Sequence, residues 1–151
     1  MSSVDSHSRA EISKLYQQYR RTFESGDAQQ VADFYRFPLH YYTDDGGKSV
    51  FDRSQFVDLV EKLLSLYRRL GVAQIVGTVK DLVAVNASAS LVSLNWILLR
   101  TDGDQTSQLY AATSRYLVVD TADGLKIDAL FASDETTKLR AVLRQRRQGR
   151  E

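Results

Sequence analysis

The chain has 151 residues, a single proline, no cysteine and a net charge of +1. This length predicts one domain that buries about two thirds of its unfolded surface without needing a disulfide or a structural metal. The absence of cysteine excludes disulfides, thiolate catalysis and sulfur-bound metal centres. The polar start MSSVDSHSRAE and the lack of an apolar run of about 18 residues argue against a signal peptide and a membrane span, so we expect a cytoplasmic protein without membrane contact.

The small net charge hides an uneven distribution. Residues 138–151 contain six basic and one acidic side chain, whereas residues 1–137 contain 14 basic and 18 acidic side chains. Such a basic run is usually solvated, and no aromatic residue or recognition motif accompanies its arginines. The sequence therefore does not favour nucleic-acid binding, and any attraction to polyanions would be a salt-sensitive property of this tail.

A stripe of apolar residues predicts the first helix. The stripe recurs at spacings of three and four residues and consists of Ile12, Leu15, Tyr16, Tyr19 and Phe23. Gly26 is expected to end this helix. Asp27 then has the character of an N-cap, with Gln30 as its capping-box partner, and opens a short second helix. We expect this helix to continue through Val31, Phe34 and Tyr35 until Pro38 stops it.

A strand and a long helix follow. The stretch LHYYT has the composition of a strand, and DDGG after it is the strongest turn signal in the chain. The long helix is expected to begin near Asp52 or Ser54 and to end at Gly71. Its amphipathic stripe consists of Phe56, Val60, Leu63, Leu64 and Tyr67.

The second half of the chain is predicted to be sheet. Four long antiparallel strands are expected at about 72–87, 89–101, 107–121 and 125–133, because turn residues separate alternating apolar runs. Residues 9–135 then form the domain. Residues 1–8 are expected to be disordered, and 136–151 to form a basic helical tail.

The second of these strands is apolar on both faces. Leu91, Ile97 and Leu99 share one face, while the other face carries Val92, Leu94, Trp96 and Leu98. The helices of the domain can cover only one of the two faces. We therefore expect a homodimer in which a second copy of the chain covers the convex face of the sheet.

Three motifs carry a resemblance to a known family. They are F-x-x-G-D at the end of the first helix, FY-x-x-P before the first strand, and G-x-K-I-x-A-L-F in the last strand. Their order resembles the nuclear-transport-factor-two-like superfamily, which includes ketosteroid isomerases, polyketide cyclases and scytalone dehydratase. The resemblance implies an α+β fold in which three N-terminal helices pack into a curved, mostly antiparallel sheet that forms a cone.

The resemblance also implies positions for a site. Ketosteroid isomerases carry an oxyanion-hole tyrosine seven residues before the glycine that ends helix one, and Tyr19 occupies that position. Their carboxylate base corresponds to Thr43, with Asp44 and Asp45 just beyond it in the turn. Their second oxyanion donor corresponds to Tyr116, eight residues before Gly124. Since threonine cannot act as the general base, isomerase activity of that type is not expected.

Two other residues are candidates for acid–base chemistry. Asp128 shares strand parity with Leu130 and Ala132, which in the family's last strand would place its carboxylate inside the cone, although a salt bridge at the strand edge is the alternative. His40 is the only histidine outside the N-terminal segment, so a histidine-rich metal site is excluded. The predicted pocket is lined by Tyr16, Tyr19, Tyr41, Thr43, Ser114, Tyr116, Asp128 and Leu130.

The sequence leaves the function open among three alternatives. The first is a small-molecule-binding domain with an apolar pocket, a small apolar or aromatic ligand, no cofactor and no metal. The second is an isomerase, a cyclase or a dehydratase that uses Asp128 or His40. The third is a non-catalytic association module. No glycine-rich loop with phosphate-binding spacing is present, so nucleotide binding has no support.

Overall fold

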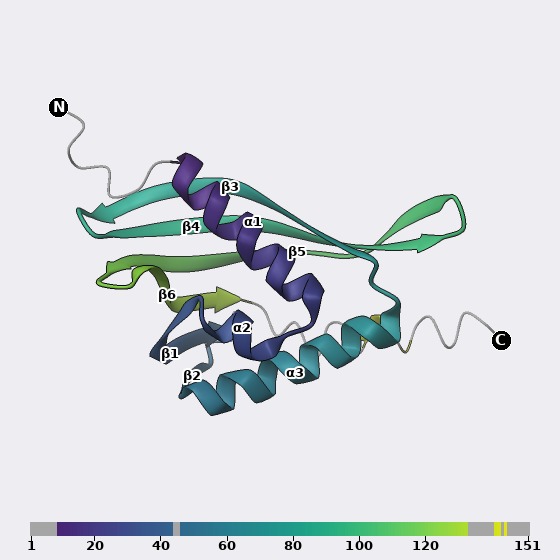
Figure 1. The fold of residues 1–151 in the computed structure, drawn as a ribbon, viewed down its shortest axis with the longest axis horizontal. Coiled ribbons are helices and arrows are strands. Elements are labelled where there is room, and N and C mark those ends of the chain that lie inside the picture. The colour runs from purple at the N-terminus through teal and green to yellow at the C-terminus, as the bar shows by residue number, and fades with distance from the viewer. Residues whose placement is uncertain (1–8, 44–45, 133–140, 143, 145–151) are drawn as a thin grey trace.

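The computed structural model describes residues 9–43, 46–132, 141–142 and 144. Its elements in chain order are α1 (Arg9–Ser25), α2 (Ala28–Ala32), β1 (Tyr35–Thr43), β2 (Lys48–Phe51), α3 (Arg53–Leu70), β3 (Gln74–Asn86), β4 (Ala89–Asp102), β5 (Gln105–Thr121) and β6 (Gly124–Ala132). The strands form one six-stranded sheet in the order β2-β1-β6-β5-β4-β3 (Figure 1). The pair β1 and β6 is parallel and the other neighbours are antiparallel. The expected α+β class with a curved, mostly antiparallel sheet is confirmed.

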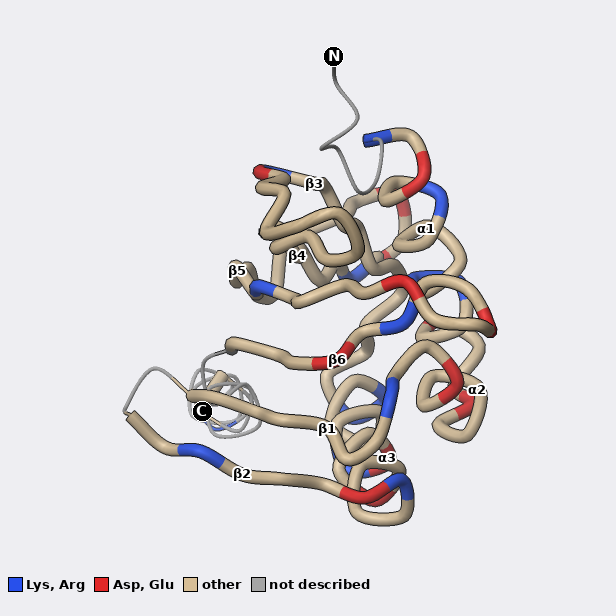
Figure 2. Tube along the Cα trace, turned by 90° about the vertical axis from the view of Figure 1, so that its left-hand side faces the viewer, with Lys and Arg blue, Asp and Glu red and all other residues tan. Residues whose placement is uncertain are grey.

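The three helices lie on the same side of the sheet, which we call the inner face (Figure 2). In helix α1 the predicted stripe is buried at four positions, Ile12, Tyr16, Tyr19 and Phe23. Gly26 follows with a φ of 79°, a left-handed conformation that glycine adopts without strain. The first helix and its end are therefore as predicted.

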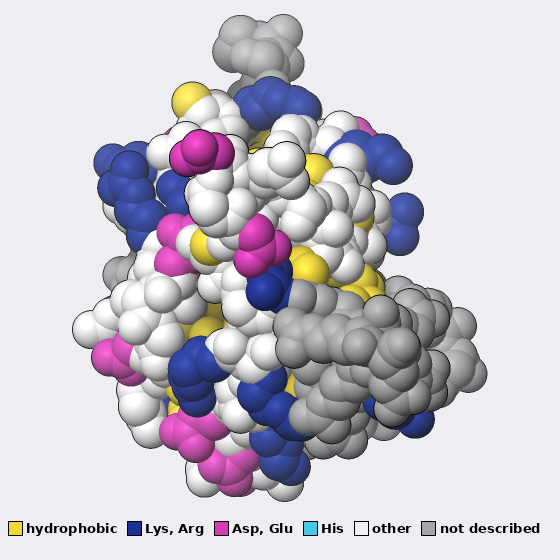
Figure 3. Space-filling view, turned by 90° about the vertical axis from the view of Figure 1, so that its right-hand side faces the viewer, with side chains coloured by type: hydrophobic (Ala, Val, Ile, Leu, Met, Phe, Trp, Pro, Cys, Tyr) yellow, Lys and Arg dark blue, Asp and Glu magenta, His cyan; other side chains and the backbone are white. Residues whose placement is uncertain are grey.

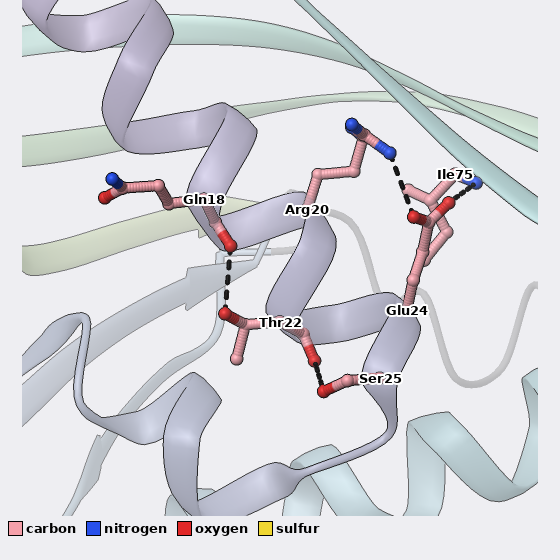
Figure 4. A network of polar contacts seen from close by, with 6 residues as sticks. All are labelled: Gln18, Arg20, Thr22, Glu24, Ser25 and Ile75. Carbon is pink, nitrogen blue, oxygen red and sulfur yellow. Dashed lines mark hydrogen bonds and ion pairs between the residues drawn. The ribbon is translucent and has the colours of Figure 1, made fainter.

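Side chains from both ends of α1 bind the backbone of the edge strand β3. The Arg9 guanidinium donates to the carbonyl oxygen of Val79 at 3.0 Å. Near the other end, the Glu24 carboxylate accepts a hydrogen bond from the Ile75 N–H at 2.8 Å and pairs with Arg20 at 2.9 Å (Figure 4). These contacts satisfy backbone groups that an edge strand would otherwise leave to water, and they fix α1 across the sheet.

The second helix is shorter than predicted. Asp27 caps it as expected, with its side chain accepting from the Gln30 N–H, but α2 ends at Ala32. The carbonyl of residue 34 accepts from the Ile127 N–H at 2.8 Å, and Tyr35 pairs with Ile127 in the sheet. Pairing with β6 thus overrides the helical pattern, and the prediction that Phe34 and Tyr35 are helical was wrong. Pro38 lies within β1, where the register with β6 shifts and a missing N–H is tolerated.

The hairpin turn predicted after β1 is followed by the short strand β2, which was not among the predicted elements.

Helix α3 begins as expected after Asp52, whose side chain forms a capping box with Gln55. It ends at Gly71 in the left-handed conformation, with a φ of 74°. Asp44 and Asp45 lie outside the described residues.

The four long strands are confirmed, with ends within two residues of their predicted positions. In β4 the side chains of Val92, Leu94 and Leu98 are buried on the inner face. Leu91 and Ile97 are half-buried on the opposite, outer face. The predicted two-faced apolar pattern is therefore present, while the homodimer remains a prediction.

The two ends of the chain are described only in part. Residues 1–8, predicted to be disordered, and most of the predicted tail 136–151 lie outside the described residues. Residues 141, 142 and 144 are helical, and Val142 packs against the hydrophobic core. In the part of the chain that the structure describes, no helix has both the length and the apolar character needed to cross a membrane.

Candidate functional site

A small cavity lies between α1, α3 and the inner face of the sheet. Its volume is about 80 Å³. Eight of its lining residues are aromatic: Tyr19, Phe23, Tyr35, Tyr41, Phe56, Tyr67, Trp96 and Tyr116. The others are Leu59, Val60, Leu63, Ile75, Leu98, Ser114 and Leu130. Because Ser114 is the only lining residue in this set that is neither aromatic nor aliphatic, the cavity is largely apolar.

Two hydrogen-bonded pairs supply most of the polar atoms in the wall. The hydroxyls of Tyr19 and Tyr35 are 2.7 Å apart and buried. The indole N–H of Trp96 donates to the hydroxyl oxygen of Tyr116 at 2.8 Å. Since an indole can only donate, the Tyr116 oxygen is the acceptor in that pair. The buried hydroxyl of Ser114 adds a third polar position.

The buried phenols of Tyr16 and Tyr35 are neutral at physiological pH. Burial raises the pKa of Tyr35 well above the ordinary value of 10.0, and the neighbouring phenol of Tyr116 raises it further, while the hydrogen bond with Tyr19 opposes the shift. Burial likewise raises the pKa of Tyr16 well above 10.0. A neutral tyrosine can donate its O–H and can accept a hydrogen bond at its oxygen, but it does not act as a general base.

The described residues that line the cavity include no carboxylate, no imidazole and no amine. General acid–base catalysis at neutral pH needs a group that titrates near that pH within reach of the reacting proton. The wall is therefore equipped to hold and orient a ligand through hydrogen bonds and apolar contacts, and supplies no ordinary proton acceptor.

Five of the eight residues predicted to line a pocket border this cavity: Tyr19, Tyr41, Ser114, Tyr116 and Leu130. Tyr16 stands behind the wall, with its ring centre 5.1 Å from that of Tyr116. Thr43 is at the end of β1, where its N–H donates to the carbonyl of Gly47 at 3.0 Å. Neither Tyr16 nor Thr43 is among the lining residues.

Asp128 corrects the expectation from strand parity. Its carboxylate accepts from the Arg36 guanidinium at 2.8 Å, its side chain is 26% exposed, and it does not line the cavity. The physical reason is a bulge: Leu117 pairs with Ala129 but Val118 pairs with Ile127, which leaves Asp128 as the extra residue. A bulge interrupts the alternation of side chains, so counting back from Leu130 gave the wrong face.

His40 also lies outside the lining of the cavity. Its neighbours in β1 are Leu39, which is fully buried, and Tyr41, which lines the cavity. Because alternate residues of a strand point to opposite faces, His40 points to the outer face. It pairs there with Val50 of β2 and Ala129 of β6.

Tyr35 and the residues of α3 line the cavity although they were not among the predicted pocket residues. Tyr35 was placed in a helix, although Tyr35, Phe37, Leu39 and Tyr41 alternate with polar residues or Pro38 and thus carry a strand signal. The α3 residues that line the cavity, Phe56, Leu59, Val60, Leu63 and Tyr67, belong largely to the apolar stripe that was recognised. That stripe was not assigned to the pocket because its position over the sheet depends on tertiary packing.

Outside the cavity, neither a metal site nor a patch of one charge stands out among the described residues. Within residues 9–43, 46–132, 141–142 and 144, no group of three or more histidine, aspartate or glutamate side chains is placed to hold a metal ion. On the face shown in Figure 3, basic and acidic side chains are interspersed and do not gather into regions of one sign. A face of this mixed kind does not favour a polyanion as partner.

Comparison with known proteins gives a family. A family model described as NTF2-like protein (DUF6841) matches residues 10–135. No curated protein matches the chain.

Several solved structures resemble the fold of this chain at low sequence identity. An NTF-2 like protein of unknown function from Shewanella oneidensis has a TM-score of 0.63 at 19% identity and covers 82% of this chain and 96% of its own. A ketosteroid isomerase-like protein from Erwinia carotovora has a TM-score of 0.60 at 16% identity, with 82% and 93% covered. A Catenulispora acidiphila protein in complex with S-DNPA has a TM-score of 0.60 at 19% identity, with 85% and 96% covered.

Proposed function

This chain belongs to the NTF2-like family DUF6841, and we propose that its domain binds a small, neutral, apolar or aromatic molecule in the cavity between α1, α3 and the sheet. The observation that carries the proposal is the composition of the wall. Aromatic and aliphatic side chains surround a few hydroxyls, and the described lining residues carry no charge. A charged ligand would lose its hydration there without gaining an opposite charge, so a neutral ligand is favoured.

An enzyme that uses Asp128 or His40 has less support. The Asp128 carboxylate is paired with Arg36, and His40 points to the outer face, so neither reaches a ligand in this cavity. A Catenulispora acidiphila protein of this fold has been solved in complex with S-DNPA, which supports a binding role for the fold.

A non-catalytic association module is the second candidate, and the size of the cavity favours it. The volume of about 80 Å³ is small, whereas a dry cavity of about 150 Å³ in another protein holds benzene. Under either function we expect a cytoplasmic homodimer that uses the outer face of the sheet.

Nuclear magnetic resonance of ¹⁵N-labelled protein tests ligand binding directly, because the chain has a single tryptophan and hence a single indole N–H signal. Trp96 lines the cavity, so titration with acetophenone should move this signal saturably. In the variant Ser114→Leu, the larger side chain on β5 should occupy space in the cavity. Binding, and with it the shift, should then be abolished. Ser65→Leu, at an exposed position of α3, is the matched control and should bind as the wild type does.

Failure of acetophenone and of a wider set of neutral aromatic compounds to move the Trp96 signal would contradict ligand binding. Equal shifts in wild type and Ser114→Leu would show that the compounds bind elsewhere. Either result would leave the association module as the better supported function.

A further inference from the structure

The hydroxyl of Tyr16 is buried and lacks a hydrogen-bond partner among the described residues. The residue is only 4% exposed. A buried hydroxyl without a partner is destabilising, because the hydrogen bond that it makes to water in the unfolded chain is not replaced. Unsatisfied groups of this kind are rare in native proteins, and each calls for an explanation such as a functional role or a bound water or ion.

Tyr16 stands directly behind the wall of the cavity. The centre of its ring is 5.1 Å from the ring of Tyr116, 5.7 Å from Tyr19 and 6.4 Å from Trp96. All three of these neighbours line the cavity. A small displacement of their side chains would therefore extend the cavity toward Tyr16.

The chemistry of this hydroxyl restricts what it can bind. Burial raises the pKa of Tyr16, and the nearby phenols of Tyr116 and Tyr19 raise it further, because a second negative charge among them would be unfavourable. Tyr16 is thus neutral, and its O–H can donate to an acceptor. An anionic acceptor would itself be desolvated in this uncharged surrounding, so an uncharged oxygen fits better.

The small size of the cavity means that it must enlarge to admit a ligand, and the surrounding contacts favour one direction of enlargement. At about 80 Å³ it is too small for a substituted aromatic ring. Opening toward most of the wall would only separate apolar contacts. Opening toward Tyr16 separates aromatic contacts too, but it also supplies a partner for an unsatisfied hydroxyl, which offsets part of the loss.

We propose that the ligand is an aromatic compound with an uncharged carbonyl oxygen, and that Tyr16 donates a hydrogen bond to this oxygen at the deep end of an enlarged cavity. The inference rests on the proposed ligand-binding function and names the ligand class that the site takes. Tyr19 and Tyr116 hold the aromatic body of the ligand on either side of that hydrogen bond.

The test compares two probes of nearly the same shape, acetophenone and α-methylstyrene, in which a carbonyl oxygen is replaced by a methylene group. Their dissociation constants are measured for wild type and Tyr16→Phe from the Trp96 indole signal. We expect Tyr16→Phe to weaken acetophenone binding by about fivefold or more, the effect of one lost hydrogen bond, and to leave α-methylstyrene binding within about twofold. Tyr42→Phe is the matched control: Tyr42 stacks on Phe131 on the outer face, with ring centres 5.0 Å apart.

The outcomes separate this inference from the proposed function. If neither probe binds wild type, ligand binding itself is contradicted. If both bind and Tyr16→Phe affects them equally or not at all, only the role of Tyr16 is overturned. The melting temperature without probe gives an independent readout: Tyr16→Phe should match or exceed wild type, because it removes an unsatisfied hydroxyl. A loss of more than about 4 °C would show that the hydroxyl already has a partner, such as an ordered water, and would overturn the inference.

Discussion

The indole of Trp96 lies directly against the backbone of Gly77, its cross-strand partner in β3. A Cβ atom at position 77 would stand 2.4 Å from Cζ3 of the indole, closer than real side chains allow. The absence of a side chain at Gly77 therefore leaves room for the six-membered ring of the indole against β3. In this position the indole N–H reaches the hydroxyl of Tyr116 at 2.8 Å.

Gly77→Ala should displace the indole and weaken its hydrogen bond to Tyr116. Because the methyl group would meet a ring held between strands and helix, we expect a loss of about 1–3 kcal/mol in the free energy of unfolding, typical of an overpacked core. Urea denaturation measures this loss, and a shift of the Trp96 indole signal reports the displacement. Thr78→Ala, at the exposed neighbouring position, should change neither quantity appreciably; a Gly77→Ala variant as stable as that control would contradict the steric argument.

The order of the elements could be predicted because each is specified by nearby residues. Gly26 and Gly71 end helices in the left-handed conformation, and Asp27 and Asp52 cap the helices that follow. These interactions span at most four residues, so the sequence alone displays them. The end of α2 could not be predicted in the same way. It depends on the pairing of Tyr35 in β1 with Ile127, a residue far away in the chain.

The site was predicted less completely, for a related reason. Tyr19 and Tyr116 border the cavity where the resemblance to ketosteroid isomerases implied. The side on which Asp128 lies depends on a bulge between β5 and β6, and a bulge leaves no signature in an alternating strand such as LKIDALF. The alternation of side chains along the strand therefore predicts the wrong face for Asp128, the residue on which the acid–base hypothesis depended.

Asp128→Asn tests that hypothesis directly. The carboxylate forms a partly exposed salt bridge with Arg36, and pairs of this kind contribute about 0–1 kcal/mol to stability. We expect a loss of stability in this range and no change in the affinity for acetophenone beyond about twofold. Isothermal or thermal denaturation and the Trp96 titration measure the two effects. A large loss of ligand affinity would mean that Asp128 acts on the ligand after all.

The outer face of the sheet predicts self-association. Ile97 and Leu91 are half-buried there, and Val83 beside them is 49% exposed. Sedimentation should give a mass near twice the 17.1 kDa of one chain at micromolar concentration. Ile97→Glu places a charge in the apolar face and should give the mass of one chain without loss of secondary structure. Ser65→Glu, on the exposed side of α3, should remain associated, and a monomeric wild type would refute the prediction.

The buried phenols predict how stability changes at alkaline pH. Burial raises the pKa of Tyr16 and Tyr35 in the folded chain above 10.0, the ordinary value expected in the unfolded chain. Below about pH 10 both states keep these protons, so the two tyrosines add no pH dependence. Above it the unfolded chain loses protons that the folded chain retains, and stability falls by about 1.4 kcal/mol per pH unit for each phenol. Urea denaturation between about pH 9 and about pH 11 measures the slope. Tyr16→Phe should reduce the slope by about the share of one phenol, because it removes one phenol and also one of the smaller causes that raise the pKa of Tyr35. An identical slope in wild type and Tyr16→Phe would show that Tyr16 ionises in the folded chain as readily as in the unfolded one.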